Sequence, residues 1–192
     1  LDDPAADYAV LPTYKLGAVA AKQVKVILSG EGGDEMFAGY GRYRSVMRPW
    51  WRGGRALRAR GMLDGLGLLR QENAGWRDGV AGAEITETKD GRTPLQVAQA
   101  TDCADCLPND LLNKLDRCLM AHGVEGRTPF LDPVVADFAF RLPDGLKVRR
   151  GRGKWLLRRW LEDHASGTEP FARKHGFTVP VGEWIAARGR IL

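Results

Sequence analysis

Apolar residues recur at helical spacing in four segments of the second half of the chain. Three of these segments begin at a residue that often caps a helix, namely Thr93, Asn109 and Asp132, and proline follows the first and the third directly. Pro143 ends the third segment, and the fourth covers Lys154–Leu161. The residues expected to face inward in the last three helices are Leu111, Leu112, Leu115, Leu119, Val134, Val135, Phe138, Leu142, Leu156, Leu157, Trp160 and Leu161.

The first part of the chain predicts one helix followed by one strand. The helix covers residues 13–22, with Thr13 as its cap and an apolar set formed by Tyr14, Leu16, Val19 and Ala20. The run from Val24 to Gly30 is rich in β-branched residues and stops at a glycine cluster, as a buried parallel strand does. No other strong strand is evident, so we expect the rest of the sheet to come from residues before Leu1.

The middle of the chain has a weaker pattern. Seven arginines and no acidic residue lie between Arg42 and Arg60, and glycines interrupt the helical periodicity, so residues 41–82 predict broken helices and loops. An Asp-Gly turn predicts a hairpin over Glu84–Thr93. A short helix is expected in the tail segment VGEWIAARG.

Composition places the chain among soluble globular proteins. It has 192 residues, of which 44% are hydrophobic and 28% charged, and this predicts one domain with its own core. No run of about 18 apolar residues predicts a membrane span, and the acidic start does not resemble a signal peptide. Because the chain opens on leucine, we expect a fragment. Three cysteines favour a reducing, cytoplasmic location.

The net charge of +5 is compatible with nucleic-acid binding or with a phosphate-handling enzyme. The arginines at 44, 48, 52 and 55 recur at helical spacing, which resembles a stripe that contacts a phosphate backbone. Pro49 and the glycines after Arg52 argue against a continuous helix there. Nucleic acid is therefore the less favoured partner.

Three cysteines and a histidine have a spacing compatible with zinc. Cys103, Cys106, Cys118 and His122 form C-x-x-C followed by C-x-x-x-H. Both pairs lie in helical patterns without the tight turns that structural zinc sites use. Small buried cysteines in a helical core are the favoured interpretation.

The segment SGEGGDE, Ser29 to Glu35, carries the chemistry. Gly30, Gly32 and Gly33 allow positive φ and close backbone approach, so that their N–H groups and the following helix could face an anion. The segment also holds acidic residues, and carboxylates beside a phosphate imply a hard cation, here Mg²⁺. The spacing fits neither a Walker A loop nor a dinucleotide fingerprint. The alternative is a tight turn with solvated acids.

Longer stretches resemble the asparagine synthetase family. LSGEGGDEMFAGYGRYR is similar to its hallmark segment, and DCLPNDLLNKLDRCLMAHGVEGRTPFLDP follows its pattern of LP, a leucine-rich helix, DR, MA and E-x-R-x-P-F-L-D. RLPDGLKVRRGRGKWLLRRWL, ARKHGFTVPVGEWI and the opening DDPAADYAVLPTY also match in order. The resemblance covers residues 1–46 and 93–192 and leaves 47–92 unmatched.

The resemblance implies an α/β PP-loop ATP pyrophosphatase fold for the parent protein, of which this mainly helical chain is the C-terminal part. It divides the chain into the end of the nucleotide-binding unit (1–46), a variable basic segment (47–92) and a helical subdomain (93–192). In such enzymes ATP adenylates the aspartate β-carboxylate with loss of pyrophosphate, and glutamine-derived ammonia displaces AMP. The implied cofactors are ATP and Mg²⁺. The implied partners are aspartate or a related carboxylic acid, a glutaminase domain of the parent chain and, as one option, a second copy in a homodimer.

The family's site residues carry over by motif. Asp34 would hold Mg²⁺, and Ser29, Gly30, Gly32 and Gly33 would shape the nucleotide pocket, while Glu31 would orient or deprotonate the incoming ammonium. Lys154 would counter charge on the α-phosphate and pyrophosphate. Glu125 and Arg127 would fix the pocket floor, with Glu125 as a further base. A structural ion pair between two helices is the alternative for Glu125 and Arg127.

The sequence also departs from the family. Its PP-loop, Ser-Gly-Gly-x-Asp-Ser, and its glutaminase nucleophile are absent, so we expect no turnover from these residues alone. A sugar-carboxylate amidotransferase and a β-lactam synthetase share the same adenylation chemistry and stay open as alternatives. A helical module that binds nucleic acid or zinc is the alternative from another class.

Overall fold

The computed structural model describes residues 7–55, 57, 78–172, 179–180, 183–184 and 186. These residues fall into two compact units. The first comprises Leu1–Ser29, Asn109–Arg127 and Phe171–Leu192, and the second comprises Gly30–Pro108 and Thr128–Pro170. The predicted division at residues 46 and 92 follows sequence motifs and stays a prediction.

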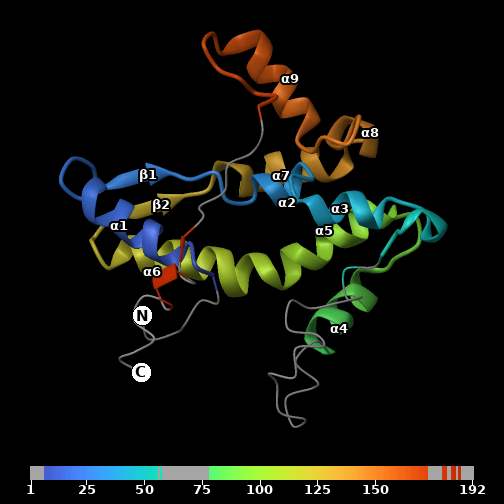
Figure 1. Ribbon diagram of the computed structural model, residues 1–192, viewed down its shortest axis with the longest axis horizontal. Coiled ribbons are helices and arrows are strands. Elements are labelled where there is room, and N and C mark those ends of the chain that lie inside the picture. Colours follow the sequence, from blue (N-terminus) through green and yellow to red (C-terminus); the bar gives the residue numbers. More distant parts are fainter. Residues whose placement is uncertain are drawn as a thin grey trace. The chain divides into compact units, whose positions relative to one another are not determined.

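Helices dominate both units, as expected. The first contains α1 (Val10–Ala20), β1 (Val26–Leu28), α6 (Asn113–Met120) and β2 (Glu125–Arg127). The second contains α2 (Gly33–Met36), α3 (Gly41–Val46), the 3₁₀ helix η1 (Trp50–Arg52), α4 (Asp78–Glu87), α5 (Pro94–Ala104), the 3₁₀ helix η5 (Pro129–Leu131), α7 (Pro133–Arg141), α8 (Asp144–Lys147) and α9 (Trp155–His164). A π-helical stretch, η4 (Leu107–Leu112), leads directly into α6 (Figure 1).

A two-stranded parallel sheet forms in the first unit. Ile27 of β1 lies opposite Gly126 of β2, and the Glu125 N–H donates to the Lys25 carbonyl at 2.8 Å. The strand predicted over Val24–Gly30 is therefore confirmed in its central three residues. A second strand, β2, also lies within the chain, whereas the rest of the sheet was expected from residues before Leu1.

The second strand was missed because Glu-Gly-Arg lacks the β-branched residues typical of strands. Gly126 faces α6, where an added Cβ would lie 2.8 Å from Leu119 Cδ1 and 3.3 Å from Leu115 Cδ2. Leu115, Leu119 and Val124 are buried there, with Ile27 of β1 packed against them. The strand is thus held by a close approach to α6 rather than by its own side chains (Figure 1).

Helix α1 packs on α6 through small residues. A Cβ on Gly17 would lie 3.0 Å from the Cys118 carbonyl oxygen, and Thr13 is buried on the same face. The prediction that Thr13 caps this helix was wrong, because the helix begins at Val10. The predicted apolar face was also wrong, since Tyr14 and Leu16 are about half exposed, at 46% and 49%.

Two predicted helix starts are confirmed. The Thr93 hydroxyl accepts from the Gln96 N–H at 3.2 Å, while the Gln96 side chain accepts from the Thr93 N–H at 2.9 Å, a complete capping box at the start of α5. The Asp132 carboxylate accepts from the Val134 N–H at 2.9 Å at the start of α7. These caps could be predicted because the partners lie within three residues of one another.

Other predicted boundaries were wrong. Asn109 caps no helix, because Pro108 lies in the first turn of η4 and helical structure already begins at Leu107. The hairpin over Glu84–Thr93 does not form. Its first residues belong to α4, so the turn at Gly91 (φ 83°) has no strand leading into it.

The predicted inward faces are confirmed only in part. Val135 of α7 and Leu142 just after it pack against the core, whereas Val134 and Phe138 are 78% and 55% exposed. Helix α9 begins at Trp155, and Trp160 is 56% exposed. Small residues explain the difference in α7, because the buried Ala139 lets that helix approach Met36 and Phe37 closely.

The basic middle segment is interrupted, as predicted. Helix α3 ends at Val46, and Pro49 separates it from η1. The stretch from 58 to 77 and most of the predicted tail helix lie outside the described residues. None of the helices in the described ranges is long and apolar enough to cross a membrane.

Removing the cap of α5 tests whether the capping box stabilises the protein. We expect Thr93→Ala to lower the free energy of unfolding by about 1 kcal/mol, because it leaves the Gln96 N–H without its acceptor and Asp144 Oδ1 without the hydroxyl that donates to it. Urea denaturation measures the change. Thr86→Ala is the matched control, since the exposed Thr86 hydroxyl only bonds to Gly82 O within α4. Equal losses in the two variants would contradict the capping role.

Candidate functional site

The glycine turn leads from the end of β1 into α2. The Gly33 N–H donates to the Gly30 carbonyl at 3.1 Å, and Gly32 has a φ of 85°. Gly32 alone of the three glycines adopts the predicted positive φ, and a Cβ there would collide with Leu131. Gly33 is helical against the Phe130 ring, 3.1 Å from the position of its Cβ. Gly30 is exposed, and none of the described atoms comes within 4 Å of its Cβ position.

The helix after the turn is shorter than the sequence predicts. Helix α2 has four residues, a single turn, before Ala38 takes a φ of 56°. A helix dipole at this turn is therefore weaker than the predicted longer helix would supply, because one turn aligns few peptide dipoles. The positions of the side chains on this turn matter more.

Asp34 and Lys154 meet although 120 residues separate them. Lys154 Nζ lies 3.1 Å from Asp34 Oδ1, and the two side chains are 27% and 19% exposed, respectively. Lys154 precedes α9 with a φ of 55°, and its N–H donates to the Phe37 carbonyl at 2.9 Å. The backbone at the end of α2 therefore fixes the main chain from which the lysine side chain extends. The structure brings these two predicted site residues together.

Two glycines that sequence analysis did not assign to the site make this approach feasible. A Cβ on Gly39 would collide with Asp34 Oδ1, and one on Gly153 would collide with the Ala38 carbonyl oxygen. Neither glycine has a positive φ, so both are needed for space rather than for backbone conformation. The only sequence signal was their place inside the matched motifs.

Glu35 is turned away from the site. Its side chain is buried, and its carboxylate accepts a hydrogen bond from the Tyr40 hydroxyl at 2.6 Å. Burial and the Glu35 carboxylate raise the pKa of Tyr40 above its usual value. Of the other two acids in the turn, Glu31 is half-buried and the Asp34 side chain is 19% exposed.

A buried polar network supports α2 from behind. The Gln99 amide of α5 donates to the carbonyls of Glu35 and Met36, at 2.9 Å for Met36. Lys147 of α8 donates in turn to Gln99 Oε1 at 2.9 Å and to the Phe140 carbonyl at 3.0 Å. Both side chains are fully buried. Neither Gln99 nor Lys147 was among the site residues predicted from the sequence.

Glu125 and Arg127 form an ion pair within β2. Arg127 Nε lies 3.0 Å from Glu125 Oε1, and both side chains are more than half exposed. The alternative in which this pair holds two helices together was wrong, because both residues lie on one strand. They and Ser29 belong to the first unit, and Asp34 with Lys154 to the second. That the two sets form one site stays a prediction.

Comparison with known proteins settles the family. A family model described as asparagine synthase matches residues 1–191. The chain belongs to the asparagine synthase family. The predicted resemblance is thereby confirmed, and the match also spans residues 47–92, which the motifs left unmatched.

Curated relatives have the same family name. A putative glutamine-hydrolyzing asparagine synthetase of Mycobacterium tuberculosis is 34% identical over 229 positions, covering 97% of this chain and 34% of the relative. Glutamine-hydrolyzing asparagine synthetase 1 of Bacillus subtilis is 32% identical and covers 96% of this chain and 35% of its own length. The chain thus spans about a third of the length of these relatives. No solved structure matches it.

The asparagine synthase family belongs to the PP-loop ATPases, which implies ATP as cofactor. The described part of this chain contains no group of three or more histidine, cysteine or acidic side chains that could hold a metal ion. Mg²⁺ in nucleotide sites is commonly held by one or two carboxylates together with phosphate oxygens and water. The partly exposed Asp34 carboxylate fits that requirement.

None of the three cysteines forms a disulfide. Cys103 and Cys106 are half-buried, and Cys118 is buried with its Sγ 3.6 Å from the Val10 carbonyl oxygen. Burial raises the pKa of Cys103 to about 12. The His122 ring packs edge-on against Tyr14, with 4.4 Å between centroids. Cys118 is buried, as the favoured interpretation predicts, whereas Cys103 and Cys106 are only partly buried.

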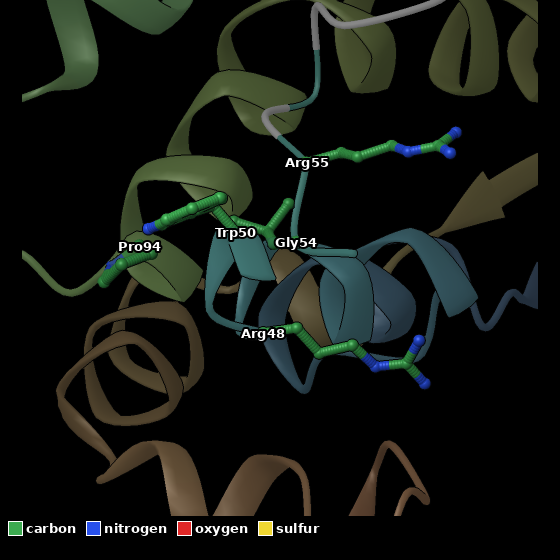
Figure 2. Close-up of a pocket in the computed structure, with 6 residues that line it drawn as sticks. Arg48, Trp50, Gly54, Arg55 and Pro94 are labelled. Carbon is green, nitrogen blue, oxygen red and sulfur yellow. The ribbon is translucent and has the colours of Figure 1, made fainter. Parts of the chain in front are cut away.

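A separate hollow of about 260 Å³ lies beside the basic segment of this family member. It is lined by Val46, Arg48, Trp50, Gly54, Arg55 and Pro94. Figure 2 shows the Arg48 and Arg55 side chains extending away from Trp50 and Pro94. Their guanidinium groups do not converge on the hollow, so it is not built to hold an anion.

The close approach at Gly39 gives a direct test of the Asp34–Lys154 pair. We expect Gly39→Ala to separate the two side chains, because the new methyl group occupies the position of Asp34 Oδ1. Overpacking of this kind costs roughly 1–3 kcal/mol, measured by urea denaturation. The control is Gly145→Ala in α8, where none of the described atoms lies within 4 Å of the Cβ position. An unaltered unfolding free energy for Gly39→Ala would contradict the packing described.

The buried Lys147 predicts a pH dependence of stability. Burial lowers its pKa from 10.5 to about 8. Between these values the unfolded chain holds a proton that the folded chain has lost, so the unfolding free energy attributable to Lys147 rises with pH from about 8 to 10.5. The full rise is roughly 3 kcal/mol.

Comparison of wild type with Lys147→Met isolates this contribution. The raised pKa of Cys103 acts in the opposite direction at high pH, and it is common to both proteins. We therefore expect the difference in unfolding free energy, wild type minus variant, to increase across that pH window. A constant difference would show that Lys147 does not titrate there.

Proposed function

We propose that this chain forms part of an enzyme for ATP-dependent amide formation. A carboxylate oxygen of the acceptor acid attacks the α-phosphorus of ATP and pyrophosphate leaves, which produces an acyl-adenylate. Ammonia then attacks the acyl carbon, loses a proton and displaces AMP. The observation that carries the proposal is the pairing of Lys154 with Asp34, which follows a turn whose exposed glycine, Gly30, leaves room for a ligand.

Asp34 is the proposed ligand of Mg²⁺. When bound, the ion would neutralise phosphate charge during adenylation. Lys154 is next to this carboxylate, and we propose that its ammonium group counters charge on the α-phosphate and on the leaving pyrophosphate. The stem of the lysine is flexible while its main chain is fixed by Phe37. An ammonium group anchored in this way can stabilise the negative charge that develops on the phosphates during adenylation.

We propose supporting roles for the remaining predicted residues. Ser29, Gly30, Gly32 and Gly33 shape the nucleotide pocket, and Glu31 orients or deprotonates the attacking ammonium. Glu125 and Arg127 contribute to the floor of the pocket. Each of these roles comes from the family motif.

Aspartate is the proposed acceptor, and the ammonia source is proposed to be glutamine. Both follow from the names of the Mycobacterium and Bacillus relatives, which describe glutamine-hydrolyzing asparagine synthetases. The chain spans about a third of those relatives, so we propose that the PP-loop and the glutaminase domain belong to the remainder of the intact enzyme. The isolated chain is then expected to be inactive.

Exposed apolar side chains on β1 support the proposal that further elements of the intact enzyme cover this sheet. Val26 and Leu28 are 47% and 75% exposed, whereas parallel sheets are normally covered on both faces.

Pyrophosphate exchange tests the proposed function. We expect the intact protein to exchange labelled pyrophosphate into ATP only when aspartate is present. Asp34→Asn should abolish exchange by removing a metal ligand, and Lys154→Ala should reduce kcat more than it raises KM for ATP. Lys89→Ala, on the exposed turn after α4, is the matched control. Wild-type exchange in Asp34→Asn would rule out the metal role, and exchange with a different acid would reassign the acceptor.

A further inference from the structure

The second unit buries a lysine that the proposed reaction does not use. Lys147 is 0% exposed, and its ammonium group donates to two neutral oxygens, Gln99 Oε1 and the Phe140 carbonyl. The Phe140 ring lies 5.4 Å from the same nitrogen. Burying an ammonium group is costly unless it is hydrogen-bonded. The positions of its two oxygen acceptors are therefore constrained in a way that a neutral side chain would not require.

The ammonium group determines which way the Gln99 amide points. An ammonium can only donate hydrogen bonds, so it requires the amide oxygen of Gln99 as its partner. The NH₂ group of that amide then faces the Glu35 and Met36 carbonyls. In the flipped amide, NH₂ would face the ammonium and oxygen would face two carbonyl oxygens. Both contacts would be repulsive.

The Gln99 amide, fixed in this orientation, supports helix α2, which would be unstable on its own. Helix α2 is one turn long, and an isolated turn is unstable because too few hydrogen bonds offset its loss of entropy. Its final carbonyls would lack partners without Gln99, which satisfies those of Glu35 and Met36.

This turn sets the backbone on both sides of the candidate site. The Gly39 N–H donates to the Asp34 carbonyl at 2.8 Å, which closes the chain around α2. The next carbonyl after the two bound by Gln99, that of Phe37, accepts from the Lys154 N–H. A shift of this turn would therefore move Asp34 and Lys154 relative to each other.

We propose that Lys147 and Gln99 are positioning residues, which act in series to hold the α2 turn so that Asp34 faces Lys154. The inference rests on the proposed function for the role of the Asp34–Lys154 pair in adenylation. It assigns neither residue to contact with substrate or metal.

A double-mutant cycle tests action in series. In the intact protein, Lys147→Met and Gln99→Leu should each reduce kcat for pyrophosphate exchange by roughly 10- to 100-fold, as loss of an outer support of a site does, with KM for ATP changing less. The double variant should be no slower than the slower single variant, because the second substitution removes a support that is already lost. Multiplied effects in the double variant would overturn the proposal.

A third variant keeps the test decisive if the apolar substitutions prevent folding. Gln99→Glu preserves the shape of the side chain and a partner for Lys147, but it replaces the NH₂ donor with an oxygen facing two carbonyls. We expect kcat to fall as far as in Gln99→Leu. Wild-type kcat in Gln99→Glu would overturn the proposal, and the control Lys89→Met should retain full activity.

Amide hydrogen exchange in the ligand-free intact protein separates this inference from the proposed function. The Gly39 and Lys154 amides, which bond to the carbonyls of Asp34 and Phe37, should exchange at least about tenfold faster in Lys147→Met than in Lys89→Met. Equal rates would overturn the positioning role. Absence of aspartate-dependent pyrophosphate exchange in the wild type would instead refute the proposed function and leave this structural result in place.

Discussion

The close contact of two backbone segments, at Gly39 and at Gly153, is the constraint on which the candidate site depends. Asp34 and Gly39 occupy one short stretch, and Gly153 with Lys154 comes from a loop more than a hundred residues later. The ion pair of 3.1 Å forms because neither glycine places a Cβ between the segments. A backbone hydrogen bond from Lys154 to Phe37 then holds the two segments together. The site is therefore defined by main-chain packing before any charge is considered.

Polar burial, rather than apolar burial alone, organises the second unit. Met36 and Phe37 supply an apolar contact to Ala139 and the Phe130 ring, but that contact does not fix the rotation of a single helical turn. The directional hydrogen bonds from Gln99 do fix this rotation. A second buried group, Asp102, similarly accepts from Arg42 at 2.8 Å and from the Tyr43 hydroxyl, and ties α3 to α5. Hydrogen-bonded networks of this kind specify one arrangement where close packing would allow several.

What the sequence could predict depended on how far apart the interacting residues lie. The caps at Thr93 and Asp132 were predicted because each side chain bonds to a backbone group two or three residues away. The strand at Glu125–Arg127 and the packed face of α1 were missed, because both depend on glycines that touch α6. Asp34 and Lys154 were found through family motifs, not through periodicity. Lys147 was missed because a lysine is normally expected at the surface, and its partners come from α5 and α7.

The uncovered face of β1 has a practical consequence for work with this polypeptide. Leu28 and Val26 are exposed apolar residues of β1. In the described part of the chain, β1 and β2 have three residues each, and each has an open edge. Open edges of this type recruit strands from neighbouring molecules. We therefore expect the 192-residue chain alone to self-associate at high concentration, which buffer screening for crystallisation or NMR has to take into account.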